Sequence, residues 1–507
     1  MIGRKPFSAR IGEKEDFAMP WNKDNLRDIV KEKIGSHKFI VVSNREPYIH
    51  SYSENGIRCI TPASGMTVAL DPVMRACGGT WIGHGSGDAD RDVVDAMDHI
   101  QVPPENPLFT LRRVWLTKEE EDTFYYGYSN EGLWPLCHIA HVRPVFRESD
   151  WISYKRVNEK FADAVLEELG SDQGFVFIQD YHFAFLPKMI KDRRPDIIVA
   201  QFWHIPWPNP EAFRVCPQAE EILWGLLGND ILGFHVRHHA LNFLDSIDRS
   251  LEVRVDRERL SVFKDGRETL VRPYPISIDF DMIEKVAGSQ ATEQRRSLLK
   301  SDFRIRNRLI GVGIDRMDYT KGIVERFNAI DRFLEKYPGY IGKFVFFQVG
   351  PLSRIRIPKY RQYNDEVYDR MVDINEKWRR KDWQPIILHK IHLGLEDVLS
   401  YYRAADICIV SSIHDGMNLV AKEFVASRID EKGVLLLSRF TGSSRELEQA
   451  ILINPLATDQ FADAIRQALE MPLEQQTERM RKMRDAVREN NVYRWAGKIV
   501  NEMKKLM

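Results

Sequence analysis

Short runs of apolar residues alternate along the chain with longer segments in which apolar residues recur every three or four positions. Uniformly apolar runs are typical of parallel strands covered on both faces, and the longer period is typical of amphipathic helices. The predicted strands lie at residues 38–43, 175–180, 197–204, 230–235, 308–315, 343–350, 384–390, 406–412 and 433–438. The predicted helices lie at residues 186–195, 210–228, 237–251, 322–338, 395–405, 418–429 and 458–471. This alternation predicts an α/β protein built on doubly wound sheets.

The alternation stops and restarts once, at the segment RPYPISIDF, residues 272–280. We therefore expect two doubly wound domains, at 37–275 and at 276–507, the second ending in a helix. Residues 1–36 are polar and predict an extension with at most one short helix. Ligands of such sheets bind beyond the carboxyl ends of the strands, so the cleft between the two sheets is the expected site.

The charge balance narrows the class of partner. The chain has 507 residues, with 73 Lys and Arg against 74 Asp and Glu, for a net charge of −1. Without a broad cationic field, neither nucleic acid nor a membrane surface is an expected partner. The sequence has no run of about 18 apolar residues and no apolar signal core near its start. Its five scattered cysteines are expected to be reduced thiols, so we expect a cytoplasmic protein.

Polar side chains follow the predicted strands where each strand ends. Arg45, Arg316, Lys321 and Arg354 are cationic and occupy such positions in both halves of the chain. Arginine forks and lysine ammonium groups both suit phosphate oxygens. The turn HDGMN at residues 414–418 leads into a helix and adds backbone N–H donors. The pattern predicts a phosphate-binding cleft.

Motifs for other chemistries are absent from the sequence. It lacks a GxxxxGK[ST] loop and a GxSxG elbow, and GVGID lacks the third glycine of a dinucleotide fingerprint. The acidic triplets at 88–90 and 279–281 have a spacing that can hold a metal, but such triplets are common in a chain this acidic. No zinc-type spacing of His and Cys occurs. We expect neither a metal nor a cofactor.

Eight motifs in order then match a known family: VVSNR, YGYSNEGLWP, QDYH, HIPWP, LGFH, DRMDYTKGI, PLSR and DGMNLVAKEF. From about Lys38 to the C-terminus the chain resembles glycosyltransferase family 20, the family of the UDP-forming trehalose-6-phosphate synthases. The resemblance implies two facing Rossmann-like domains of GT-B type, the first for the acceptor and the second for the nucleotide-sugar donor. It also implies metal-independent transfer of glucose from UDP-glucose to glucose-6-phosphate with retention of configuration.

The resemblance assigns residues to the donor and to the acceptor. For catalysis it implies His204 at the donor sugar, Asp180 near the acceptor sugar, and Arg316 and Lys321 at the diphosphate. Asp415 would contact the glucose hydroxyls and Glu423 the ribose. The remaining donor residues would be Gly65, Gly416, Met417, Asn418, Leu419 and Val420. The acceptor residues would be Arg45, Tyr125, Trp134, Asp180 and Arg354. Lys422, next to Glu423, is expected to face solvent or to form an ion pair.

Two departures from the family pattern bear on the acceptor. His84 stands where the family usually has the second Trp of Trp-x-Gly-Trp, and the loop at 46–64 is long. Its Arg-Glu-Pro-Tyr opening resembles glucosylglycerol-phosphate synthase, which uses ADP-glucose and glycerol-3-phosphate and remains an alternative. A non-catalytic, sugar-phosphate-sensing relative is a second alternative. The sequence is compatible with a homo-oligomer, and it carries no phosphatase half, so a separate phosphatase is expected downstream.

Overall fold

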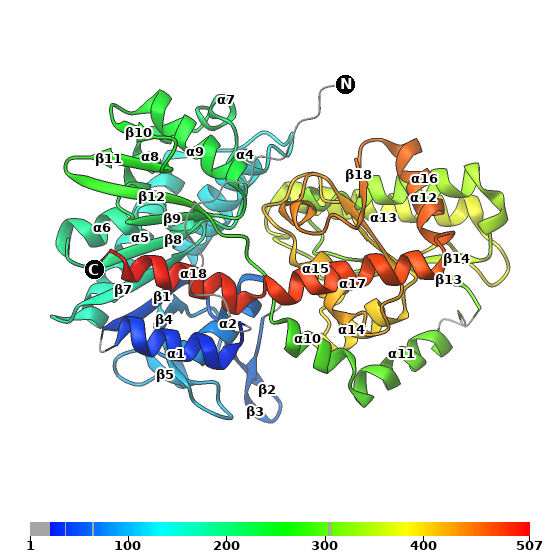
Figure 1. Cartoon of the computed structure of the whole chain (residues 1–507), viewed down its shortest axis with the longest axis horizontal. Coiled ribbons are helices and arrows are strands. Elements are labelled where there is room, and N and C mark those ends of the chain that lie inside the picture. Colours follow the sequence, from blue (N-terminus) through cyan, green and yellow to red (C-terminus); the bar gives the residue numbers. More distant parts are fainter. Residues whose placement is uncertain (1–20, 36, 63–64, 303–304, 306, 507) are drawn as a thin grey trace, which may run out of the picture.

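The computed structural model describes residues 21–35, 37–62, 65–302, 305 and 307–506, and it consists of two α/β units side by side (Figure 1). Each unit has its own sheet with helices on both faces. The ten-stranded sheet has the order β10-β11-β12-β9-β8-β7-β1-β4-β6-β5, and the six-stranded sheet has the order β15-β14-β13-β16-β17-β18. The fold class predicted from the apolar runs is confirmed.

The first sheet is parallel from β12 to β6, and antiparallel strands extend it at both edges. Its strands are β1 (Lys38–Arg45), β4 (Thr80–His84), β5 (His99–Val102), β6 (Phe109–Val114), β7 (Gly174–Gln179), β8 (Ile198–Phe202), β9 (Ile231–Phe234), β10 (Arg254–Asp256), β11 (Ser261–Lys264) and β12 (Arg267–Pro273). A separate hairpin pairs β2 (Ile49–Ser53) with β3 (Gly56–Ile60).

Helices bury both faces of this sheet. In β1, Ile40 and Val42 point into one core while Phe39 and Val41 point into the other, because successive side chains of a strand alternate. The helices of this unit are α1 (Lys23–Ile34), α2 (Gly65–Cys77), α3 (Lys118–Glu120), α4 (Trp134–His138), α5 (Glu148–Leu169), α6 (Leu186–Arg193), α7 (Pro210–Phe213), α8 (Ala219–Leu226) and α9 (Arg237–Ser250), with a π-helix, η2, at Glu121–Leu133. The two-sided burial explains why the central strands are apolar throughout.

The second sheet is parallel at every pairing, as its apolar strands predict. Its strands are β13 (Leu309–Ile314), β14 (Phe344–Val349), β15 (Ile386–His389), β16 (Ile407–Val410), β17 (Val434–Ser438) and β18 (Ile451–Ile453). Its helices are α10 (Phe280–Ala287), α11 (Gln290–Asp302), α12 (Ile323–Lys336), α13 (Pro358–Trp378), α14 (Leu395–Ala404), α15 (Leu419–Ser427), α16 (Thr458–Leu469) and α17 (Leu473–Glu489). Short 3₁₀ turns follow several strands, including η4 (Tyr319–Lys321) after β13.

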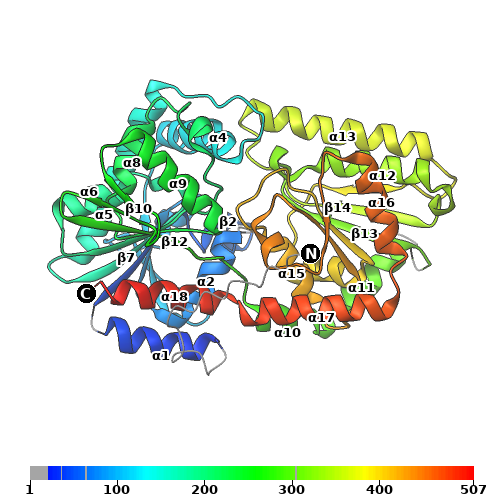
Figure 2. The same ribbon diagram turned by 45° about the horizontal axis from the view of Figure 1, so that its top comes forward.

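The last helix, α18 (Val492–Lys504), returns to the first unit. Figure 2 shows it beneath the first sheet beside α1, in line with α17 under the second unit. The Trp495 ring lies 5.8 Å from the Phe177 ring and 5.2 Å from the Phe202 ring. The chain therefore passes between the units twice. A domain boundary between residues 275 and 276 stays a prediction, and it assigns α18 to the second domain although this helix packs on the first unit.

Helix α1 confirms a short helix in residues 21–35; residues 1–20 and 36 lie outside the described part. The five cysteines are free, as expected. Within the described ranges no helix is both long and apolar enough to cross a membrane. The sequence prediction missed several elements, above all α5, α13 and the strands between residues 49 and 114.

Candidate active site

The carboxyl ends of the two sheets face each other and touch. The Nη2 atom of Arg354, from the loop after β14, lies 3.4 Å from the hydroxyl of Tyr181, just after β7. The Nδ1 atom of His414 lies 2.9 Å from the carbonyl oxygen of His138 at the end of α4. The first contact joins two of the strand-end segments that the sequence marked as polar, and the second joins a third such segment to α4.

A cationic cluster with residues from both units forms at this junction. Arg45, the last residue of β1, donates from Nη2 to the hydroxyl of Tyr125 on η2 at 2.9 Å. The guanidinium of Arg354 lies 4.1 Å above the ring of Trp134, the first residue of α4. His84 pairs with Arg45 in the register of β1 and β4, so the departure from the family pattern is next to this cluster. Four of the five acceptor residues expected from the sequence thus lie together.

Arg354 is held from several sides. Its side chain is only 6% exposed, and its backbone is in the left-handed region with a φ of 46°. Its Nη1 atom donates to the hydroxyl of Tyr360 at 2.6 Å and lies 3.6 Å from Asp318 Oδ2. Burial would raise the pKa of Asp318, but the charges of Arg354, Arg316 and Lys321 outweigh burial and lower the pKa. Asp318 therefore stays ionised among three cations.

The same cations act on Tyr125. Burial alone would raise the pKa of its phenol, but the nearby guanidinium groups of Arg45 and Arg354 lower the pKa to about 7. The His182 ring stacks on the Tyr125 ring at 5.7 Å and 14°. Two guanidinium groups on one phenol favour the binding of an anion beside them, and a phosphate group is such an anion.

On the second-unit side, Lys321 and Asp415 form a largely buried ion pair. Lys321 ends η4, and its Nζ atom lies 2.5 Å from Asp415 Oδ2, with each side chain 14% exposed. Asn418 and Ser412 also donate to Asp415, at 3.2 Å and 3.3 Å. Burial would raise the pKa of Asp415, but Lys321 outweighs burial and lowers the pKa. The predicted diphosphate cation and the predicted glucose ligand are therefore neighbours.

The turn between β16 and α15 fits against the first unit. A Cβ on Gly416 would lie 2.5 Å from the carbonyl oxygen of His204 and 2.8 Å from the Cδ2 atom of His235, so only glycine fits without displacing backbone. Met417 is 2% exposed and belongs to a hydrophobic core of the first unit. Leu419 reaches Gly65, at the start of α2, because an ideal Cβ there would lie 3.5 Å from Leu419 Cδ1.

Asn418 begins α15 as its N-cap. Its Oδ1 atom accepts from the backbone N–H of Ala421 at 3.1 Å, and its own φ is 77°. Val420 follows in the first turn and packs against the second-unit core. The first backbone N–H groups of a helix have no acceptor within the helix, and the helix dipole at the start of α15 favours negative charge.

The neighbouring charged residues Glu423 and Lys422 of α15 have different surroundings. Glu423 is half-buried; its Oε2 atom lies 3.5 Å from the hydroxyl of Tyr402, and burial raises its pKa to about 7. Lys422 is fully buried and forms an ion pair with Glu446 at 2.6 Å, while it also donates to the carbonyl oxygen of Ile276 at 2.8 Å. Of the two expectations for Lys422, the ion pair is confirmed and the solvent-facing position is wrong.

Asp180 and His204 follow the neighbouring strands β7 and β8, and the charges of Arg354 and Arg316 act on Asp180. Asp180 follows β7 with a φ of 74°, and its Oδ1 atom accepts from the backbone N–H of His204 at 3.2 Å. Burial raises the pKa of Asp180 to about 7, and burial lowers the pKa of His204 to about 3. The His204 imidazole is therefore neutral, with its Nε2 atom 2.9 Å from Oε1 of Gln179.

Arg316 completes the set. Its guanidinium lies 5.9 Å from the Trp134 ring, and its charge acts on both Asp180 and Asp318. It is half-buried. The structure thus gathers the expected site residues at one junction, except Val420 and Glu423, whose contacts given above lie within the second unit. The individual roles of these residues stay predictions.

Sequence reasoning missed several residues that hold this site. Tyr181, Tyr360 and Asp318 lie next to Arg354. The Gly416 turn packs against His235. Tyr181, Asp318 and His235 lie within motifs used for the family resemblance. Nothing in the sequence shows that these side chains contact the opposite unit or hold the site.

The acidic triplets have structural roles. Asp90 accepts from the backbone N–H groups of His50 and Gly87 and pairs with the buried Arg113. Asp279 caps α10 and accepts from the hydroxyl of Tyr493. Among the described residues, no group of three or more His, Cys, Asp or Glu side chains could hold a metal ion.

The chain is similar to known proteins over most of its length. A trehalose-6-phosphate synthase of Mycolicibacterium vanbaalenii is 35% identical over 472 residues, which cover 91% of this chain and 95% of that protein. A structure from E. coli bound with UDP-2-fluoro glucose superposes with a TM-score of 0.82 at 30% identity, covering 93% of this chain and 99% of the other. A UDP-forming α,α-trehalose-phosphate synthase from Burkholderia xenovorans, in complex with glucose-6-phosphate, gives 0.82 at 29% identity, covering 92% and 99%.

The fold is therefore of the GT-B type, with two facing Rossmann-like units. The family model described as glycosyltransferase family 20 matches residues 37–505, nearly the whole chain. On that match and on the relatives above, this chain belongs to glycosyltransferase family 20.

Proposed function

We propose that this chain transfers glucose from UDP-glucose to glucose-6-phosphate with retention of configuration, giving α,α-trehalose-6-phosphate. The observation that carries the proposal is the pair of cationic groups at one junction. Arg45 and Arg354 lie beside Tyr125 and Trp134, and Lys321 lies with Asp415 on the opposite side. A reaction that joins a nucleoside-diphosphate sugar to a sugar phosphate requires two such phosphate-binding groups.

The relatives support the choice of substrates. The E. coli structure holds a fluorinated UDP-glucose, and the Burkholderia protein is UDP-forming and holds glucose-6-phosphate. The alternative acceptor, glycerol-3-phosphate with ADP-glucose, has no such support among them. The presence of every expected cationic and donor residue also disfavours a non-catalytic sensor.

The donor cluster would act on the leaving group. When the bond between the glucose C1 atom and the diphosphate oxygen breaks, negative charge grows on the diphosphate. Lys321, Arg316 and the N–H groups at the start of α15 would stabilise that charge more than they stabilise intact donor. Such preorganised contacts are worth about 10²–10³ in rate each.

The acceptor would be held so that its hydroxyl attacks the same face of the sugar from which the diphosphate leaves. A new bond forms from the acceptor oxygen to C1, and the acceptor proton passes to the departing phosphate oxygen. Asp180 accepts from the backbone of His204 and lies among cations, so it is placed to orient hydroxyl groups rather than to form a covalent intermediate. His204, neutral at working pH, would accept or donate a hydrogen bond at the donor sugar.

Because the acceptor phosphate takes no part in bond making, it remains on the product. We therefore expect a separate phosphatase to act next on the phosphorylated disaccharide.

Product analysis tests the proposal. The purified chain is incubated with UDP-, ADP- and GDP-glucose, each against glucose-6-phosphate and glycerol-3-phosphate, and products are identified by mass and by the anomeric NMR couplings. We expect α,α-trehalose-6-phosphate from UDP-glucose and glucose-6-phosphate. Glucosylglycerol phosphate as the main product, or no transfer from any donor, would overturn the assignment.

A further inference from the structure

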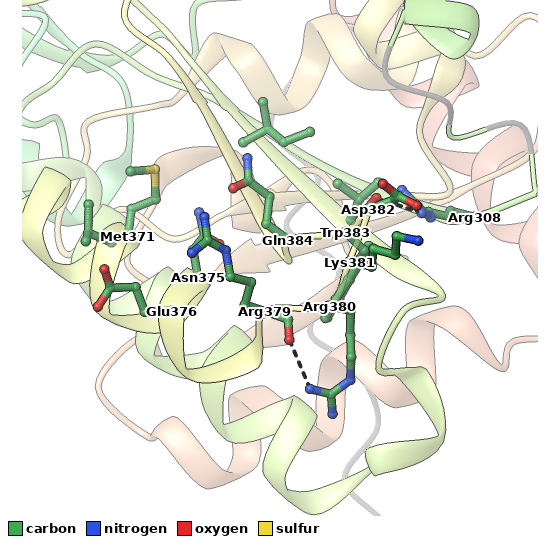
Figure 3. A pocket seen from close by; sticks show the side chains of 13 residues that line it. Arg308, Met371, Asn375, Glu376, Arg379, Arg380, Lys381, Asp382, Trp383 and Gln384 are labelled. Carbon is green, nitrogen blue, oxygen red and sulfur yellow. Dashed lines mark hydrogen bonds between the residues drawn. The ribbon is translucent and has the colours of Figure 1, made fainter.

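The second unit has a pocket far from the junction described above. It measures about 570 Å³ and lies between the C-terminal part of α13 and the amino ends of β13, β14 and β15 (Figure 3). The candidate active site lies beyond the carboxyl ends of the same strands. A parallel sheet separates its two ends by the length of its strands, so a molecule in this pocket cannot touch the active site.

The pocket gathers cations that have no acidic partner within the described part of the chain. Arg308, Arg379, Arg380 and Lys381 line it, together with the acidic residues Glu376 and Asp382. Among the described residues, none of the four cations has a carboxylate within the 4.0 Å of an ion pair.

The hydrogen bonds of Arg308 and Arg380 go to backbone carbonyl oxygens, which carry no full negative charge. Arg308 Nη2 donates to the backbone carbonyl oxygen of Asp382 at 3.2 Å, and Arg380 Nη1 donates to that of Arg379 at 3.1 Å. Figure 3 shows the Arg379 side chain running beside Asn375 and the Arg308 side chain beside Asp382. The local charge is thus an excess of two positive charges in a chain whose net charge is −1.

Apolar and aromatic groups form the floor of the pocket. Val345 on β14, Ile387 on β15 and Met371 on α13 line it beneath the cations. Trp383 adds an indole that is held in place, because its Nε1 atom donates to the carbonyl oxygen of Phe344 at 2.8 Å. A rigid apolar floor under a cationic rim suits a ligand with an organic body and an anionic group.

We propose that this pocket binds a small phosphorylated molecule that carries at least two negative charges. Like charges held together without counter-ions repel, and a phosphate group that enters removes that cost while it accepts several charge-assisted hydrogen bonds. Guanidinium forks from neighbouring positions match the oxygens of a phosphate or diphosphate. The volume accommodates a sugar phosphate or a mononucleotide.

The test must separate this pocket from the active site, which also has phosphate-binding cations. Binding of inorganic pyrophosphate is therefore measured by isothermal titration calorimetry on the full chain carrying Lys321→Ala and Arg354→Ala. Two double substitutions are compared in that background. The first combines Arg379→Gln and Lys381→Gln, and the matched control combines Lys285→Gln and Lys432→Gln. The matched pair removes the same charge from exposed positions of the same unit, outside the pocket.

We expect one pyrophosphate to bind per chain in the background variant, and we expect the affinity to fall at least about tenfold on loss of Arg379 and Lys381, since each lost charge-assisted contact is worth about that factor. The matched pair should bind as the background does. All four substituted side chains are exposed, so the melting temperature should not change in either pair. The absence of binding in the background, or an equal loss in both pairs, would overturn the proposal.

Discussion

Substitution of Lys321 by alanine is the most direct test of the donor cluster. Its Nζ atom contacts Asp415 at 2.5 Å inside a region where both side chains are only 14% exposed. The substitution therefore removes a proposed diphosphate contact, and it also leaves the Asp415 carboxylate without its cation. These two effects have different sizes and can be measured apart.

The catalytic effect should be the larger one. Loss of one preorganised contact to a charge that grows in the transition state lowers kcat about 10²–10³-fold, or about 3–4 kcal/mol. Removal of one partner of a buried pair costs about 3–5 kcal/mol of folding free energy. Here the cost should lie at the low end, because Asn418 and Ser412 still donate to Asp415 and the pKa of its carboxyl can rise toward its ordinary value.

Release of UDP at saturating donor and acceptor gives kcat, and thermal melting with circular dichroism gives the folded state. Lys321→Ala combined with Asp415→Asn is the control, since it removes the unpaired carboxylate. If the slow turnover came from that carboxylate, the double variant would recover most of the activity. We expect no recovery beyond about tenfold. Near-normal turnover of a folded Lys321→Ala protein would refute the assignment of Lys321 to the diphosphate.

The other predictions concern the acceptor and the ribose. Arg354→Ala should raise the acceptor KM and spare the slow hydrolysis of donor; an unchanged KM would remove Arg354 from the phosphate site. Asp318→Asn should raise the same KM through loss of orientation of Arg354, and normal kinetics would show that Tyr360 suffices. Glu423→Gln should raise the donor KM more than it lowers kcat, because a ribose contact is made equally before and during transfer; the reverse pattern would contradict this role. Tyr125, with a pKa of about 7, becomes anionic above that pH and opposes a phosphate dianion. Acceptor kcat/KM should therefore fall above about pH 7 in the native chain and stay level in Tyr125→Phe; an identical fall in both would exclude Tyr125.

Polar residues at strand ends mark much of the candidate site for a simple physical reason. Strands β7, β8, β13 and β16 are buried on both faces, so their apolar runs are visible in the sequence and their ends can be placed. The first polar residues after those ends, such as Asp180 and Arg316, then lie at the carboxyl edge of a parallel sheet. Neither step needs knowledge of the opposite unit.

What the sequence could not show depends on that opposite unit. The stacking of Arg354 over Trp134 brings together residues 220 positions apart from different sheets, and no periodicity records it. Helix α5 is a different kind of omission. Its buried residues Trp151, Tyr154 and Phe161 have helical spacing, so the sequence alone contains enough signal to predict this helix.

The turn at Gly416 shows why donor binding and the closed arrangement of the two units belong together. Its backbone lies so close to the His204 carbonyl oxygen that a Cβ has no room, and the next residue, Met417, is buried in the core of the first unit. The segment proposed to hold glucose and diphosphate is therefore part of the contact between the units. If the units separated, Lys321 and Asp415 would stay paired on one side, but the Gly416 turn would lose the surface that fixes it against His204. It follows that Gly416→Ala, which would push this turn away from His204, should weaken donor use although it removes no charged side chain.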